Sequence, residues 1–132
     1  GIRNNNPMNI RKGNSWKGER PVKQDSQFEE FISMEYGLRA GFKLMRNHIT
    51  GFRCTRPKMN TIQKLIGVWA PRTENATDRY VNIVCKRTGY IPNQIIDPSN
   101  SGMMIAIAQA MVYVECGVEI KKEYFYSAWA LL

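Results

Sequence analysis

Residues 105–117 read IAIAQAMVYVECG, and this stretch decides the fold because so apolar a helix must lie in the core. Spacings of three and four residues place one set of side chains on a single helix face, namely Met104, Ile107, Ala108, Met111 and Glu115. A carboxylate at the end of this stripe is unusual, because burying an ionised carboxylate is costly unless it is paired. Burial favours the protonated acid, which makes Glu115 a candidate proton donor. The alternative is a helix-end glutamate that reaches solvent or pairs with Lys121 or Lys122.

Three further helices are predicted before this one, and the first two precede Pro71. Ser33 is expected to be the N-cap of the first, with Glu35 in its first turn. Its buried stripe is expected to be Leu38, Phe42, Met45 and Ile49. A loop follows between Gly51 and Pro57. The second helix is predicted over 61–69, and Pro71 should stop it because the residue before a proline is biased out of the α region.

The remaining helices complete a mainly α prediction. One should begin near Thr77 and end before Gly89. Asp97 or Ser99 should open the long apolar helix, which Gly117 ends, and a short helix should cover 124–129. Residues 1–31 have isolated apolar positions and are expected to form loops and one or two short strands, docked by Phe28 and Phe31. The predicted fold class is therefore mainly α (α+β), one domain over 1–132, with four or five helices and a small irregular or β-hairpin segment.

Charge and composition narrow the class of partner. The chain has 132 residues and a net charge of +8, which favours an anionic partner such as nucleic acid, anionic lipid or the bacterial wall. No apolar run approaches the roughly 18 residues that span a bilayer, and the first residues lack a signal-peptide core. We therefore expect export by host lysis or as part of a larger protein. The cysteines, Cys54, Cys85 and Cys116, form no CxxC pair, so we expect no metal site, at least one free thiol and at most one disulfide.

Several polar and aromatic residues are candidates for binding. The Asn-rich segment NNNPMNI at 4–10 suits either tight turns or ligand contacts. Trp16 can stack on a sugar or cover the core. Asn75 and Thr77 are typical cap residues, and Tyr80 can place a hydroxyl at a cleft. His48, the single histidine, has no catalytic partner in any motif and is interpreted as structural.

These motifs together resemble a known family. GIRNNNPMNIR at 1–11, WKG at 16–18, the Phe28-x-x-Phe31 pair, EYGLRA at 35–40, WAP-x-x-EN-x-T-x-x-Y at 69–80 and Glu-Cys-Gly at 115–117 resemble a family of phage-virion and phage-like bacterial proteins that look lysozyme-like. The resemblance covers nearly the whole chain. The sequence departs from the family pattern at Met8, where glycine is expected, and at Cys116, where asparagine or serine is expected.

A second resemblance supplies a mechanism. Bacterial autolysins of glycoside hydrolase family 73 carry a helix ending in Glu-Ser-Gly, then an NNLFGIK-like segment, a Trp-Lys-Gly, an aromatic pair and a Thr-Asp-x-x-Tyr. The present chain is similar but places the glutamate helix last, as a circular permutation would. The resemblance implies that Glu115 is the general acid and that Tyr80 lines the cleft. A second carboxylate is left open among Glu35, the first choice, and Glu30, Asp25 and Glu74.

The expected activity is cleavage of the β-1,4 bond of peptidoglycan glycan by a glucosaminidase, muramidase or lytic transglycosylase. Expected catalytic residues are Glu115, Tyr80 and Glu35. Expected sugar-binding residues are Asn5, Asn6, Asn9, Trp16, Tyr36, Trp69, Glu74 and Asn75. The protein should act as a monomer in the cell wall or periplasm without cofactor, metal, nucleic acid or membrane insertion. Two alternatives stay open, a non-catalytic virion or wall-binding protein on the same fold and a basic nucleic-acid-binding helical domain.

Overall fold

The computed structural model describes residues 1–70 and 73–132. It contains the short 3-10 helix η1 (Ile2–Asn4) and the helices α1 (Met34–Cys54), α2 (Ile62–Trp69), α3 (Glu74–Thr88), α4 (Ser101–Cys116) and α5 (Lys122–Ala130). The mainly α prediction is confirmed. Within the described ranges no helix has both the length and the hydropathy needed to cross a bilayer. The predicted stop at Pro71 lies outside the described residues.

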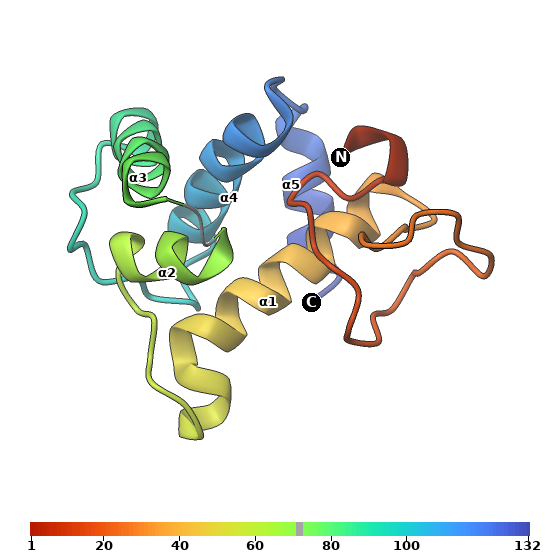
Figure 1. Ribbon diagram of the computed structural model, residues 1–132, viewed down its shortest axis with the longest axis horizontal. Helices are drawn as coiled ribbons and strands as arrows, with labels where there is room; N and C mark the ends of the chain where they lie inside the picture. Colours follow the sequence, from red (N-terminus) through yellow and green to blue (C-terminus); the bar gives the residue numbers. More distant parts are fainter. Residues whose placement is uncertain (71–72) are drawn as a thin grey trace.

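Helix α4 is the centre of the molecule. It packs against α3 on one side and against α1 and α5 on the other (Figure 1). Neighbours on several sides explain why α4 is apolar around most of its circumference, and its buried residues are Met103, Met104, Ile105, Ile107, Ala108, Ala110, Met111 and Val112. Gly117 ends the helix in the left-handed region at φ 71°, as predicted.

The start of α4 differs from the prediction. Asn100 is the N-cap, and its side chain accepts a hydrogen bond from the Met103 N–H. The Asp97 carboxylate instead accepts hydrogen bonds from the N–H and the hydroxyl of Ser99, which closes a local turn before the helix. Neither Asp97 nor Ser99 caps α4.

Helix α1 forms the floor of the core. The Ser33 side chain caps it by accepting from the Tyr36 N–H, and the four residues of the predicted stripe are buried. Helix α5 lies along α1, where Trp129 meets Phe42 edge to face at 5.2 Å between ring centroids. Regular α-helical geometry ends at Gly51, since Gly51 and the next two residues have positive φ.

Helices α2 and α3 complete the core. Thr61 caps α2, which buries Ile62, Leu65 and Ile66 as predicted. Helix α3 begins at Glu74, three residues earlier than expected, because the Thr73 side chain accepts from the Ala76 N–H and is the N-cap. The capping role considered for Asn75 and Thr77 is therefore wrong, since both lie inside the helix. Gly89 is the left-handed C-cap, as predicted.

The first 33 residues run over α1 as loops. Instead of strands, the described residues of this segment form two isolated antiparallel bridges, Arg11 with Phe28 and Glu19 with Phe31. Phe31 is fully buried and docks the segment, whereas Phe28 is only half-buried. The segment approaches α1 at two glycines. A Cβ on Gly37 would overlap the Asn5 carbonyl oxygen, and a Cβ on Gly41 would overlap the Met8 sulfur.

All three cysteines are free thiols. Cys85 and Cys116 are half-buried, whereas Cys54 is exposed rather than packed as a small apolar side chain. The Cys116 thiol donates a hydrogen bond to the Pro7 carbonyl oxygen at 3.1 Å. This contact links the end of α4 to the N-terminal segment.

Candidate functional site

The candidate site is the Glu115 carboxyl group at the C-terminal end of α4. It is half-buried. Its Oε1 accepts a hydrogen bond from the Asn9 amide at 2.8 Å, and its Oε2 accepts one from the Tyr80 hydroxyl at 3.0 Å. The structure thus brings together three residues that the sequence places in the N-terminal segment, in α3 and in α4. The expected proximity of Glu115 to the NNPMNIR segment is confirmed.

The Asn9 side chain is held in one orientation. Its Oδ1 accepts a hydrogen bond from the Gly1 nitrogen at 2.7 Å, so that the amide nitrogen faces Glu115. Its backbone is left-handed, with φ 54°, a conformation that asparagine tolerates better than most residues. The Asn9 amide nitrogen also lies 3.5 Å from the Glu115 carbonyl oxygen. The Asn-rich turn therefore serves to aim one amide at the carboxylate.

Tyr80 belongs both to the core and to the candidate site. Its ring is buried in the core, with 3% of the residue exposed, in contact with the face of α4 that carries Met111. Its hydroxyl reaches Glu115 and lies 3.5 Å from the Met111 carbonyl oxygen. The ring anchors the hydroxyl, and the hydroxyl orients the carboxylate.

The expectation that Asn6 binds sugar is wrong. Asn6 is fully buried. Its amide nitrogen donates to the carbonyl oxygens of Ile10 and Glu29, and its Oδ1 accepts from the Ile10 N–H. All of these hydrogen bonds are to backbone groups of the N-terminal segment, so Asn6 stabilises the loop. Asn5 remains half-exposed, although its amide nitrogen donates to the Phe31 carbonyl oxygen at 3.1 Å.

Three aromatic residues expected at the site are half-buried. The Trp69 indole donates to the Met8 carbonyl oxygen at 3.2 Å, which ties α2 to the Asn-rich segment. Trp16 packs on the small cluster of Ile10, Phe31 and Ala40, and within the described chain its buried indole N–H has no acceptor. Tyr36 packs on the same cluster, and Gly18 of the WKG motif lies flat against its ring where a Cβ would clash.

Two carboxylates considered as the second catalytic group have structural roles instead. Glu30 is buried and accepts hydrogen bonds from the backbone N–H groups of Asp25 and Gln24 and from Arg20. The Asp25 N–H, together with these other donors, holds the pKa of Glu30 below its ordinary value. The N–H groups of Phe28 and Gln27 likewise lower the pKa of Asp25. Among the described residues, the hydrogen-bond partners of both carboxylates belong to the N-terminal segment itself, and neither carboxylate is hydrogen-bonded to Asn9, Tyr80 or Glu115.

The other two carboxylates stay open. Glu35 is half-buried in the first turn of α1. Among the described residues, no hydrogen bond or ion pair links Glu35 to Asn9, Tyr80 or Glu115. Glu74 and Asn75 are exposed in the first turn of α3, the helix that supplies Tyr80.

Sequence reasoning missed the two glycines of α1 that seat the Asn-rich segment. Gly37 and Gly41 are both buried and lie one turn apart. Small residues four apart on a helix indicate close approach by another backbone or a bulky side chain. The spacing of Gly37 and Gly41 was therefore the feature of the sequence that could have predicted this contact. Met8, where the motif leads one to expect glycine, places its sulfur over the bare face of Gly41.

Comparison with known proteins places the chain in a family. No family model matches the sequence. Over 121 residues it is 36% identical to Protein P5 of Pseudoalteromonas phage PM2, an alignment that covers 89% of this chain and 71% of that protein. The chain belongs to the family of this phage protein. Membership of the P5 family supports the phage association that the motifs predicted.

Proposed function

We propose that this P5-family protein cleaves the glycan strands of bacterial peptidoglycan, with Glu115 as the general acid. The observation that carries the proposal is the position of the Glu115 carboxyl group. Asn9 donates a hydrogen bond to one of its oxygens and Tyr80 to the other, and the residue is still partly exposed to solvent. A carboxyl group held by two separate elements needs little reorganisation before it transfers a proton. Partial exposure leaves room for a glycosidic oxygen to approach.

The proposed chemistry begins with proton transfer from Glu115 to the leaving oxygen as the glycosidic C–O bond breaks. Positive charge then develops on the sugar ring, in the manner of an oxocarbenium ion. Attack by water completes hydrolysis, and attack by a hydroxyl of the same sugar completes a transglycosylase reaction. Glu35 and Glu74 are the candidates for a second carboxylate. The net charge of +8 favours the anionic wall as the place of action.

The proposal includes the fold relationship to lysozyme-like autolysins by circular permutation. A permuted order requires the two ends of the chain to lie near each other. Near the N-terminus, the Asn5 carbonyl lies against Gly37 of α1. Near the C-terminus, the Leu131 carbonyl oxygen accepts a hydrogen bond from Arg39, two residues further along α1. Both ends of the chain therefore contact the same part of α1.

The sugar subsites are proposed to lie around Glu115 on partly exposed residues. The candidates are Asn5, Asn9, Trp16, Tyr36, Trp69, Glu74 and Asn75. The Trp69 indole N–H and the Asn5 amide nitrogen each donate a hydrogen bond to a backbone carbonyl oxygen of the protein. Their contribution to sugar binding is therefore expected to come from the remaining amide oxygen of Asn5 and the ring of Trp69.

Glu115→Gln tests the proposal. The variant keeps the shape of the side chain and removes the acid, so wall digestion should fall by at least about 100-fold. The readout is mass spectrometry of muropeptides released from purified peptidoglycan. Glu123→Gln is the matched control, because Glu123 is an exposed glutamate in the first turn of α5 and does not line a site that the proposals use. Undiminished digestion by Glu115→Gln would reject the assignment of the acid.

A non-catalytic virion or wall-binding role is the second candidate. The observation that favours it is the same pair of hydrogen bonds, since a carboxylate with both oxygens engaged can serve to join α3, α4 and the N-terminal segment. On this reading the wild-type protein sediments with peptidoglycan, or assembles into virions, and releases no muropeptides from any wall type. Glu115→Gln would then change the melting temperature and leave wall binding unaltered.

A further inference from the structure

A cavity lies on the opposite side of α4 from Glu115. It is lined on α4 by Ala106, Gln109 and Ala110. Glu115 follows Ala106 by nine positions, which is about two and a half helical turns at 3.6 residues per turn, and so faces the other way. The cavity has a volume of about 600 Å³, within the range of small-ligand sites. It is therefore separate from the candidate catalytic site.

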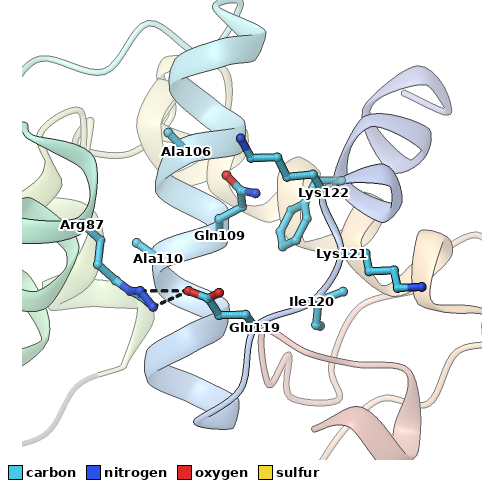
Figure 2. Close-up of a pocket in the computed structure, with 9 residues that line it drawn as sticks. Arg87, Ala106, Gln109, Ala110, Glu119, Ile120, Lys121 and Lys122 are labelled. Atoms are coloured by element: carbon cyan, nitrogen blue, oxygen red, sulfur yellow. Dashed lines mark hydrogen bonds and ion pairs between the residues drawn. The ribbon is translucent and has the colours of Figure 1, made fainter.

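One wall of the cavity carries an ion pair between Arg87 and Glu119. Both terminal nitrogens of Arg87 donate to Oε1 of Glu119, at 3.1 and 2.6 Å, and Figure 2 shows this contact spanning the gap from α3 to the loop before α5. The Arg87 guanidinium also lies 3.6 Å from the centroid of the Tyr113 ring. Arg87 is thus held on two sides, and it keeps Glu119 in place.

The opposite end of the cavity carries two polar groups, the Lys122 ammonium and the Gln109 amide. In Figure 2 the Lys122 side chain reaches back over Gln109, whereas the Lys121 ammonium points away from the other side chains. In the described part of the chain, neither the Lys122 ammonium nor the Gln109 amide has an ion-pair or hydrogen-bond partner. An ammonium beside an amide is a suitable site for a carboxylate.

The floor of the cavity is apolar, and the aromatic ring in its lining, Phe125, is almost completely buried. Ala106, Ala110 and Ile120 present small or aliphatic groups. The nearby Tyr113 ring is covered by Arg87. Sugar rings commonly stack on exposed aromatic rings, so this lining suits a ligand with methyl groups and charges better than a glycan.

We propose that this cavity binds the stem peptide of peptidoglycan, as a second contact with the wall. The inference rests on the proposed function. A stem peptide offers alanine methyl groups for the floor and a carboxylate for Lys122 and Gln109. Its diamino acid offers an ammonium for Glu119, whose Oε1 accepts from Arg87 and whose Oε2 accepts no hydrogen bond from the residues that the structure describes. The peptide comes from a neighbouring part of the wall, because α4 separates the cavity from Glu115.

Titration with the tripeptide L-alanyl-γ-D-glutamyl-meso-diaminopimelate tests the inference, followed by backbone amide shifts in nuclear magnetic resonance. The expected shifts are at Gln109, Glu119, Ile120 and Lys122. Lys122→Gln should weaken binding about tenfold, through loss of one charge-assisted hydrogen bond. Ala106→Leu should abolish binding by filling the floor. The matched control is Lys86→Gln, an exposed lysine next to Arg87 that does not line the cavity.

The outcomes separate this inference from the proposed function. Cleavage of peptide-free glycan strands by the wild-type protein, with no tripeptide shifts at the cavity, overturns only the inference. Tripeptide shifts at the cavity that Lys122→Gln weakens, without cleavage of any wall, support the inference and reject the catalytic role. Tripeptide binding that persists unchanged in both Lys122→Gln and folded Ala106→Leu also overturns it.

Discussion

Asn9 and Glu115 lie 106 positions apart in the chain, and a 2.8 Å hydrogen bond joins their side chains. The bond fixes the N-terminal segment against the end of the central helix. It also determines which way the carboxyl group faces. The site therefore depends on the whole fold, and a substitution of either residue should alter the position of the other side chain.

Asn9→Asp should make stability depend on pH in a new way. The replacement keeps an oxygen for the Gly1 nitrogen and sets a second carboxylate against Glu115. Two adjacent carboxylates cannot both ionise without repulsion, so the melting temperature should fall relative to wild type as pH rises from about 4 to about 7. Wall digestion should fall as well. Parallel melting curves across this range would show that the two groups are not in contact in solution.

Tyr80→Phe should separate the ring from the hydroxyl. The ring stays packed, so the free energy of unfolding should drop by only about 1 kcal/mol for the lost hydrogen bond. Muropeptide release should drop by about tenfold, because Oε2 of Glu115 loses a donor. Tyr80→Ala, which also removes the ring, should cost about 3–5 kcal/mol. A large loss of stability in Tyr80→Phe with normal digestion would assign the hydroxyl to the core alone.

Gly37→Ala should destabilise the protein by about 1–3 kcal/mol or more, because the new methyl group would overlap the Asn5 carbonyl oxygen, which is backbone and cannot turn aside. The control is Gly67→Ala in α2, where, apart from the helix's own backbone, no atom of the described residues lies within 4 Å of the added Cβ. This second change should instead raise stability by about 0.5–1 kcal/mol through helix propensity. Chemical denaturation of both variants measures the contrast, and equal effects would contradict the close packing at Gly37.

His48 should make the protein less stable in mild acid. Burial, with a smaller effect from Arg56, lowers the pKa of His48 from its ordinary value of 6.5. The unfolded chain then binds a proton at higher pH than the folded chain does, so stability falls as pH drops through the range below about 6.5. His48→Phe keeps the edge-to-face packing on Phe52 and Trp69 and removes this dependence. Identical slopes of melting temperature against pH for the two proteins would refute the assignment.

The positions of the helices and their buried faces could be predicted from the sequence. A helix has 3.6 residues per turn, so the spacing of apolar residues along the chain shows directly which of them share one face. Leu38, Phe42, Met45 and Ile49 were predicted as one stripe and are buried together. Helix starts were less predictable. Several residues near each start can cap, and the choice of Thr73 and Asn100 depends on which side chain is free once local turns such as that of Asp97 and Ser99 have formed.

The glutamate was found from the sequence because a carboxylate that closes an apolar stripe stands out by its chemistry alone. Its partners required the tertiary structure. Asn6 and Asn9 lie close together in the sequence but have different partners. The Asn6 side chain points into the protein and donates to the Glu29 carbonyl oxygen, whereas the Asn9 side chain donates to Glu115. Those choices depend on atoms 23 and 106 residues away. Hydrogen bonds act over about 3 Å of space whatever the distance along the chain, so only the folded chain could decide them.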